Sequence, residues 1–245
     1  MLRRVARVGN TLVEAVLYGS VGGEELGAAL RLLGEAYGTG GPGLVELRLY
    51  PDEAVMEAVV SELAAEAGVA AGAGFELFAH EAWSGVPRIH AVAPALLRGP
   101  MYEALFVHEA VHSLLHGSLE YYMAEPGVDA LLYYVAATTV KDLEVHGYMA
   151  RRGLLGRLKL LQGYWLRVLS EGGYGALDVL RALTVWAAVG EEPLGPLRKA
   201  LGASLEKLYA WMRTVLEEWQ RKGARPWAKR LELLRLLEGL GLALY

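Results

Sequence analysis

Residues 105–117 read Leu105-Phe106-Val107-His108-Glu109-Ala110-Val111-His112-Ser113-Leu114-Leu115-His116-Gly117. Apolar or small residues surround two histidines that stand four positions apart, and no proline interrupts the segment. This pattern predicts a helix that begins at Pro100 and ends at Gly117, since glycine commonly follows the last turn of a helix. On such a helix, His108 and His112 lie one turn apart and point to the same side.

Two imidazoles at this spacing can bind one zinc ion. Glu109 is rotated by about 100° from His108 around the helix axis, so it lies near a zinc-bound water without being a ligand. Zinc lowers the pKa of its bound water to about 7, and a neighbouring carboxylate can take the proton as the water attacks a carbonyl. The alternative is a core helix with hydrogen-bonded histidines, and burying these groups without partners would be expensive. The motif therefore predicts a hydrolase with one Zn²⁺ ion, bound by His108 and His112, and Glu109 as general base.

On these residues the chain resembles the zincin metallopeptidases, in particular their gluzincin-like branch. The similarity covers the motif helix, the mixed strand and helix region before it, and the helix after it. It implies a metallopeptidase that acts on a peptide or protein substrate. It also implies a strand at the lip of the cleft just before the motif helix, where residues 88–93 (Arg-Ile-His-Ala-Val-Ala) stand. As an edge strand, this segment would bind an extended peptide by strand addition.

A catalytic zinc ion usually has three protein ligands and one water. The metzincin pattern, with a third histidine in a longer motif, does not follow Gly117. His116 lies about 12 Å along the helix axis from His108, too far to bind the same ion. We interpret it as a histidine at the helix C-terminus, near the negative end of the dipole.

The third ligand is expected in the helix around residues 140–150. Asp142-Leu143-Glu144-Val145-His146, followed by Tyr148, is similar to the ligand helix of some gluzincin families. The similarity implies Asp142 as the metal ligand and His146 as a residue that steadies a ligand. The segment departs from the family, because Asp replaces the usual Glu and His replaces Asp or Asn. Glu144 and His146 therefore remain alternative ligands, and a solvated charged face is a further interpretation.

The two halves of the chain differ in their predicted elements. Helices are expected at 24–34 and 51–68, with strands at 44–50, 75–79 and 88–93. After residue 126 the pattern predicts helices only, at 127–151, 154–170, 174–189, 204–222 and 226–239. We expect an α+β, zincin-like fold with the active-site helix between two parts. Residues 1–125 would form an α+β domain that ends in the motif helix, and residues 126–245 an all-α domain that supplies the third ligand.

Composition narrows the class of protein further. The chain has 245 residues, no cysteine and a formal net charge of -4. The absence of cysteine excludes disulfides and thiolate metal sites, and the negative charge argues against nucleic acid as the main partner. One Asn and two Gln fit a thermophile, although a GC-rich genome gives the same bias. No uninterrupted apolar run indicates a signal peptide or stable membrane insertion, so we expect a cytoplasmic protein.

Four further signals carry less weight. His80 and His90 fall in predicted strands, where surface or hydrogen-bonded histidines are common. Residues 38–43 match the letters GxGxxG but follow a helix and precede a strand, the reverse of the dinucleotide-binding order. The basic segment 219–230 is interpreted as a loop between amphipathic helices. Five tyrosines include candidates for a donor that stabilises an oxyanion: Tyr121, Tyr122, Tyr133, Tyr134 and Tyr148.

Two other functions remain open at this point. A zincin fold can serve binding or regulation with little proteolysis, because fold and motif do not guarantee activity. The long all-α half could instead belong to a helical interaction protein without metal.

Overall fold

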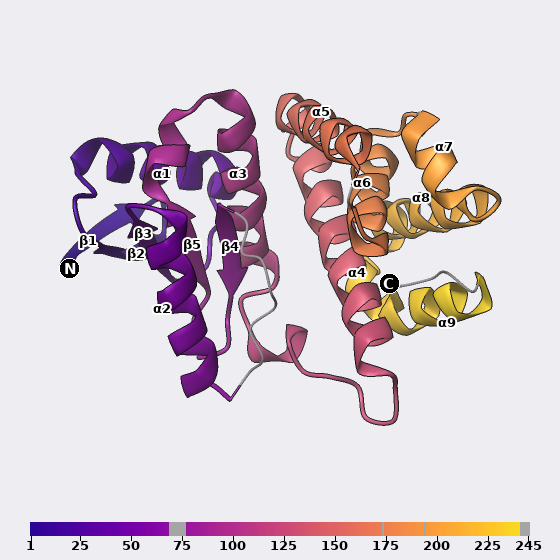
Figure 1. Cartoon of the computed structure of the whole chain (residues 1–245), viewed down its shortest axis with the longest axis horizontal. Helices are drawn as coiled ribbons and strands as arrows, with labels where there is room; N and C mark the ends of the chain where they lie inside the picture. The colour runs from indigo at the N-terminus through magenta and orange to yellow at the C-terminus, as the bar shows by residue number, and fades with distance from the viewer. Residues whose placement is uncertain (69–76, 173, 194, 241–245) are drawn as a thin grey trace. The chain divides into compact units, whose positions relative to one another are not determined.

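The computed structural model describes residues 1–68, 77–172, 174–193 and 195–240. These residues form a mixed protein with a five-stranded sheet and many helices, which confirms the α+β class. The chain divides into two compact units, Met1–Met123 and Ala124–Tyr245. Figure 1 shows the strands in the first unit, and the described part of the second unit contains helices alone.

The sheet of the first unit has the order β1-β2-β3-β5-β4. Its strands are β1 (Leu2–Val8), β2 (Thr11–Leu17), β3 (Leu44–Tyr50), β4 (Phe78–Glu81) and β5 (Arg88–Val92). The three inner strands are parallel, whereas each edge strand runs antiparallel to its neighbour. Predicted strands at 44–50 and 88–93 are thus confirmed. The strand predicted at 75–79 begins at Phe78, and positions 75 and 76 lie outside the described residues.

The expectation that residues 88–93 form an edge strand is wrong. β5 pairs with β3 on one side and with β4 on the other, so its backbone groups are used within the sheet. The edge beside the motif helix is β4 instead. Alternation of apolar and polar residues predicts that a strand exists, but it carries no information on which strands lie beside it.

The N-terminal hairpin was not predicted. β1 and β2 pair along their whole length around a two-residue turn, Gly9 and Asn10. Gly9 has φ 57°, a left-handed conformation that glycine adopts without strain. Most of β1 is exposed, with three arginines among its seven residues, so the strand lacks a clear apolar face.

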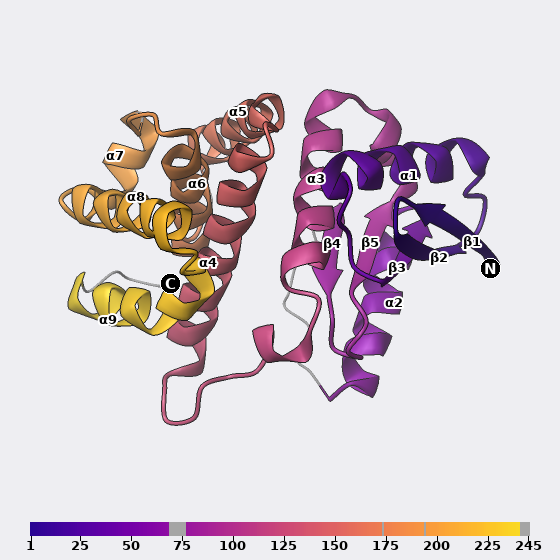
Figure 2. The same cartoon turned by 180° about the vertical axis from the view of Figure 1, so that it is seen from behind.

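Helices α1 (Gly23–Tyr37) and α3 (Pro100–Leu115) pack together against one face of this sheet (Figure 2). That face carries Val45, Leu47 and Leu49 of β3, all fully buried. Helix α2 (Glu53–Glu66) packs against β3 and β5. Short 3₁₀ turns, Ala93–Leu97 and Leu119–Tyr121, flank α3. The apolar core of the unit therefore lies under α1 and α3, and it fixes the orientation of the motif helix.

The second unit is built around α4. Its elements are α4 (Ala130–Arg151), α5 (Leu155–Glu171), α6 (Ala176–Val189), α7 (Gly195–Leu201), α8 (Ser204–Lys222), a 3₁₀ turn (Pro226–Lys229) and α9 (Arg230–Leu240). Helix α4 packs against α5, α6, α8 and α9, which explains why most of its residues are buried. The predicted helices of this half are confirmed, and α7 is an additional helix in a segment where none was predicted. Within the described ranges, no helix has both the length and the apolar character needed to cross a bilayer.

Candidate metal centre

Local sequence explains where α3 begins and ends. Gly99 precedes it with φ 121°, and Pro100 occupies the first turn, where a missing N–H costs nothing. His116 is the last, non-helical position, and Gly117 follows. A Cβ at Gly117 would lie 2.8 Å from the carbonyl oxygen of Ser113, so only glycine fits this close turn. The predicted end of the motif helix is confirmed.

The helix brings the two motif histidines together. Nε2 of His108 and Nε2 of His112 lie 3.0 Å apart, with ring planes at 77° to each other. Two nitrogens bound to one tetrahedral zinc ion at about 2.0–2.1 Å would be about 3.3 Å apart. His108 is partly exposed and His112 is buried, with 8% of its surface exposed. The pair therefore fits zinc in donor type, spacing and access.

Glu109 lies beside this pair. Its Oε1 is 3.8 Å from Nε2 of His108, the same ring nitrogen that faces His112. Its side chain is 17% exposed, so the carboxylate is near the surface of the unit. A carboxylate so placed can exchange protons with a group held at the histidine pair.

His116 is not a solvent-facing histidine at the helix end. It is fully buried, and its Nδ1 lies 3.0 Å from Nδ1 of His112. The ring of Tyr121 packs edge-on against it, with centroids 4.9 Å apart. The interpretation of His116 as a partner of the helix dipole is therefore incomplete, because its ring is directed to His112.

His80, on β4, was expected to be a surface or hydrogen-bonded histidine. Its ring stacks on His112, with centroids 6.1 Å apart and planes at 10°. Nδ1 of His80 lies 2.8 Å from the hydroxyl of Tyr122. Burial, together with the charges of Glu81 and Glu109, raises the pKa of Tyr122 well above its usual value, so the hydroxyl keeps its proton. The alternation in β4 puts His80 and Phe78 on the α3 side, but sequence alone did not identify α3 as the helix above them.

The second unit holds the candidate third ligands on α4. Asp142 is 2% exposed, and Nε of Arg181 on α6 lies 3.1 Å from its Oδ2. His146, one turn further on, is also buried and has Nδ1 2.8 Å from Oγ1 of Thr184. Both side chains therefore face α6.

Glu144 has a different environment. It is fully buried and forms an ion pair with Arg225, which follows α8. Burial raises the pKa of Glu144, and Arg225 opposes that shift. Its face of α4 thus differs from that of Asp142 and His146. Of the candidates for the third ligand, Asp142 belongs, with His108 and His112, to a group of residues that could hold a metal ion.

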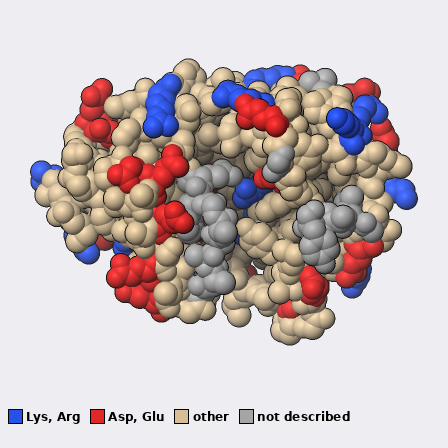
Figure 3. Space-filling model, viewed as in Figure 1, with Lys and Arg blue, Asp and Glu red and all other residues tan. Residues whose placement is uncertain are grey.

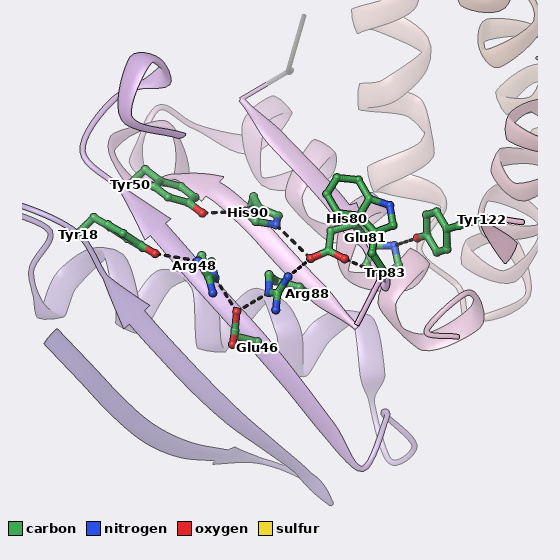
Figure 4. A network of polar contacts seen from close by, with 10 residues as sticks. All are labelled: Tyr18, Glu46, Arg48, Tyr50, His80, Glu81, Trp83, Arg88, His90 and Tyr122. Atoms are coloured by element: carbon green, nitrogen blue, oxygen red, sulfur yellow. Dashed lines mark hydrogen bonds and ion pairs between the residues drawn. The ribbon is translucent and has the colours of Figure 1, made fainter. Parts of the chain in front are cut away.

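A second group of polar side chains occupies the opposite face of the sheet (Figure 4). Glu46, Arg88 and Glu81 are neighbours across β3, β5 and β4, and Arg88 forms ion pairs with both acids. Nδ1 of His90 lies 2.7 Å from the hydroxyl of Tyr50, and its Nε2 is 3.7 Å from Glu81. Burial lowers the pKa of His90, so its ring is neutral. His90 is therefore a buried, hydrogen-bonded histidine of the sheet, as expected.

The basic segment at 219–230 contains the end of α8, a 3₁₀ turn and the start of α9. Most of its cations have acidic partners in the same unit: for example, Arg225 pairs with Glu144, and Arg230 lies 3.1 Å from Glu125. Both acidic and basic side chains are visible on the face drawn in Figure 3. The segment is thus part of the packing of the helical unit.

Tyr133 and Tyr134, two of the candidate tyrosines, lie on α4 and differ in their surroundings. The hydroxyl of Tyr133 accepts a hydrogen bond from Arg230, and Tyr134 is exposed.

A pocket of about 450 Å³ lies at the end of α3, between residues 113–117 and the turn at 85–87. Its lining includes Tyr121 but not His108, Glu109 or His112.

Comparisons with protein-family models, curated proteins and solved structures found no match for the chain.

Proposed function

We propose that this protein is a zinc-dependent hydrolase, and more specifically a metallopeptidase, in which His108, His112 and Asp142 bind one Zn²⁺ ion. The observation that carries the proposal is the 3.0 Å separation of the two Nε2 atoms on α3. Two neutral imidazoles and one carboxylate form a donor set that zinc prefers in catalytic sites. Because the chain has no cysteine, no thiolate competes with this set.

Asp142 is favoured as the third ligand over its neighbours on α4. The contact with Arg181 engages its Oδ2 and orients the carboxylate, which has a second oxygen suited to a metal. The Glu144 carboxylate is committed to Arg225. His146 has one ring nitrogen beside Thr184, on the same side of α4 as Asp142, so it is the weaker alternative.

Glu109 is proposed as the general base and acid. When bound, zinc would act as a Lewis acid that favours ionisation of a water molecule and polarises a carbonyl. The carboxylate of Glu109 accepts a proton from the attacking water and later delivers it to the leaving amine. The outer edge of β4 is the strand edge nearest this helix, and an extended peptide can add to such an edge.

The test uses the full chain and four variants. We expect purified wild type to bind one zinc ion and to cleave members of a peptide library, with cleavage lost in chelator. Glu109→Gln should keep zinc and lower the cleavage rate by about 10²–10⁴-fold, the usual worth of a general base. His108→Ala and Asp142→Asn should lose zinc affinity.

Glu144→Gln is the matched control for Asp142→Asn, because it makes the same acid-to-amide change on the same helix. It should bind zinc as the wild type does. A Glu109→Gln protein that cleaves at the full rate would refute the mechanism. A wild-type protein that binds zinc but cleaves no peptide would indicate a binding or regulatory role instead.

A further inference from the structure

The zinc site proposed above leaves the third histidine of the motif helix without a function. We propose that His116 is a positioning residue: through its Nδ1 it holds the His112 ring and keeps a proton on Nδ1 of His112. This inference rests on the proposed function and adds a part to the same site.

The geometry of α3 brings His116 to His112. Side chains on a helix lean toward its N-terminus, so a residue one turn later covers the residue before it. His116 also ends the helix, with φ −126° and ψ 31°, while its backbone N–H still donates to the carbonyl of His112 at 2.7 Å. The three rings therefore follow one another, with nitrogen to nitrogen distances of 3.0 Å at both steps.

The position of the protons follows from these contacts. Two ring nitrogens at 3.0 Å can hydrogen bond only if one carries hydrogen and the other accepts it. Nε2 of His112 needs its lone pair for zinc, so in the neutral ring the hydrogen is on Nδ1. Nδ1 of His116 must then be the acceptor, and His116 carries its own hydrogen on Nε2.

Burial supports a function for His116 beyond packing. The ring is 0% exposed, and burying an imidazole in an apolar setting is unfavourable unless its nitrogens are hydrogen bonded. Tyr121 packs edge-on against it at 4.9 Å. His80 stacks on the face of His112, so His112 is held both at one nitrogen and on one face.

His116 differs chemically from the usual partner of a zinc-bound histidine. That partner is most often a carboxylate or a backbone carbonyl. A neutral imidazole accepts the same hydrogen bond without adding negative charge beside the ligand. The His112 ring is then fixed in orientation and tautomer, while the charge of the site is set by the ligands and Glu109.

The experiment compares zinc affinity by competition with a chromophoric chelator in wild type, His116→Leu and His116→Gln. Loss of a partner of this kind typically weakens metal binding by about 10–100-fold, which is expected for His116→Leu. His116→Gln keeps a side-chain acceptor and should recover most of that affinity. His90→Leu is the matched control, because it removes an equally buried, hydrogen-bonded imidazole of the same unit from the opposite face of the sheet.

Two further measurements separate positioning from folding. Unfolding in chelator reports the stability of each metal-free variant. If His116 positions His112, the loss of zinc affinity across the variants should not parallel their loss of metal-free stability. Long-range ¹H–¹⁵N spectra of the zinc-loaded wild type should identify His112 as the Nδ1–H tautomer and His116 as the Nε2–H tautomer.

The outcomes are distinguishable. Wild-type zinc affinity in His116→Leu overturns this inference and leaves the proposed function intact. An equal loss in His90→Leu, or a donor hydrogen on Nδ1 of His116, also overturns it. A wild-type chain that binds no zinc overturns the proposed function and this inference with it.

Discussion

Gly147 lies on the same helix as the candidate ligand Asp142, and its lack of a side chain lets α4 approach α8 closely. A Cβ at this position would lie 2.5 Å from Cδ2 of Leu216 and 3.2 Å from the ring of Trp219. Leu216 can turn, but Trp219 is covered by Arg151, whose Cζ is 3.2 Å from the centroid of the ring. We therefore expect Gly147→Ala to destabilise the protein.

Two opposing terms set the magnitude. Alanine is favoured over glycine in a helix interior by about 1 kcal/mol. Overpacking a buried position typically costs about 1–3 kcal/mol, and the blocked Trp219 ring puts this site in the middle of that range. The net loss of unfolding free energy is then about 1 kcal/mol, or about 2–4 °C in melting temperature for a chain of this size.

The assay is thermal and urea unfolding in chelator, so that metal does not contribute. Gly163→Ala is the matched control, because Gly163 is exposed in the middle of α5 and a Cβ there would meet nothing within 4 Å. That variant should gain up to about 1 kcal/mol. If Gly147→Ala is stabilised as much as Gly163→Ala, the reasoning about the close contact of α4 and α8 is refuted.

Three other changes test the first unit. Ser113→Ala removes the acceptor of the buried Tyr37 hydroxyl, 2.6 Å away, and should lower the unfolding free energy by about 1–3 kcal/mol in urea titrations. Phe106→Ala removes a fully buried ring that meets Phe78 edge-on, and a loss of about 3–5 kcal/mol is expected by the same assay. Because burial lowers the pKa of His90 below its usual 6.5, the unfolded chain binds this proton more readily. The contribution of His90 to the free energy of unfolding is therefore fully present above about pH 6.5 and is lost as the pH drops. In His90→Gln the difference in urea midpoint between pH 7.5 and 5.5 should be smaller than in the wild type. An unchanged difference would contradict the lowered pKa of His90.

The sequence by itself determined the features that depend on neighbouring residues. The spacing of His108 and His112 places both rings on one side of a helix, whatever surrounds it. Pro100 and Gly117 mark its ends through their own backbone preferences. The strand pattern of β3 and the main helices of the second half follow from periodicity in the same way.

Only the tertiary structure decided which distant segments meet. β5 lies inside the sheet because β4 pairs outside it, and no residue within β5 encodes that neighbour. His80 reaches His112 because α3 packs over β4. Glu144 differs from Asp142 because it pairs with Arg225, in the loop after α8, whereas Asp142 meets Arg181 of α6. The motif helix could therefore be predicted from local geometry, whereas the partners that orient His112 and separate the acids of α4 depend on packing between elements far apart in the chain.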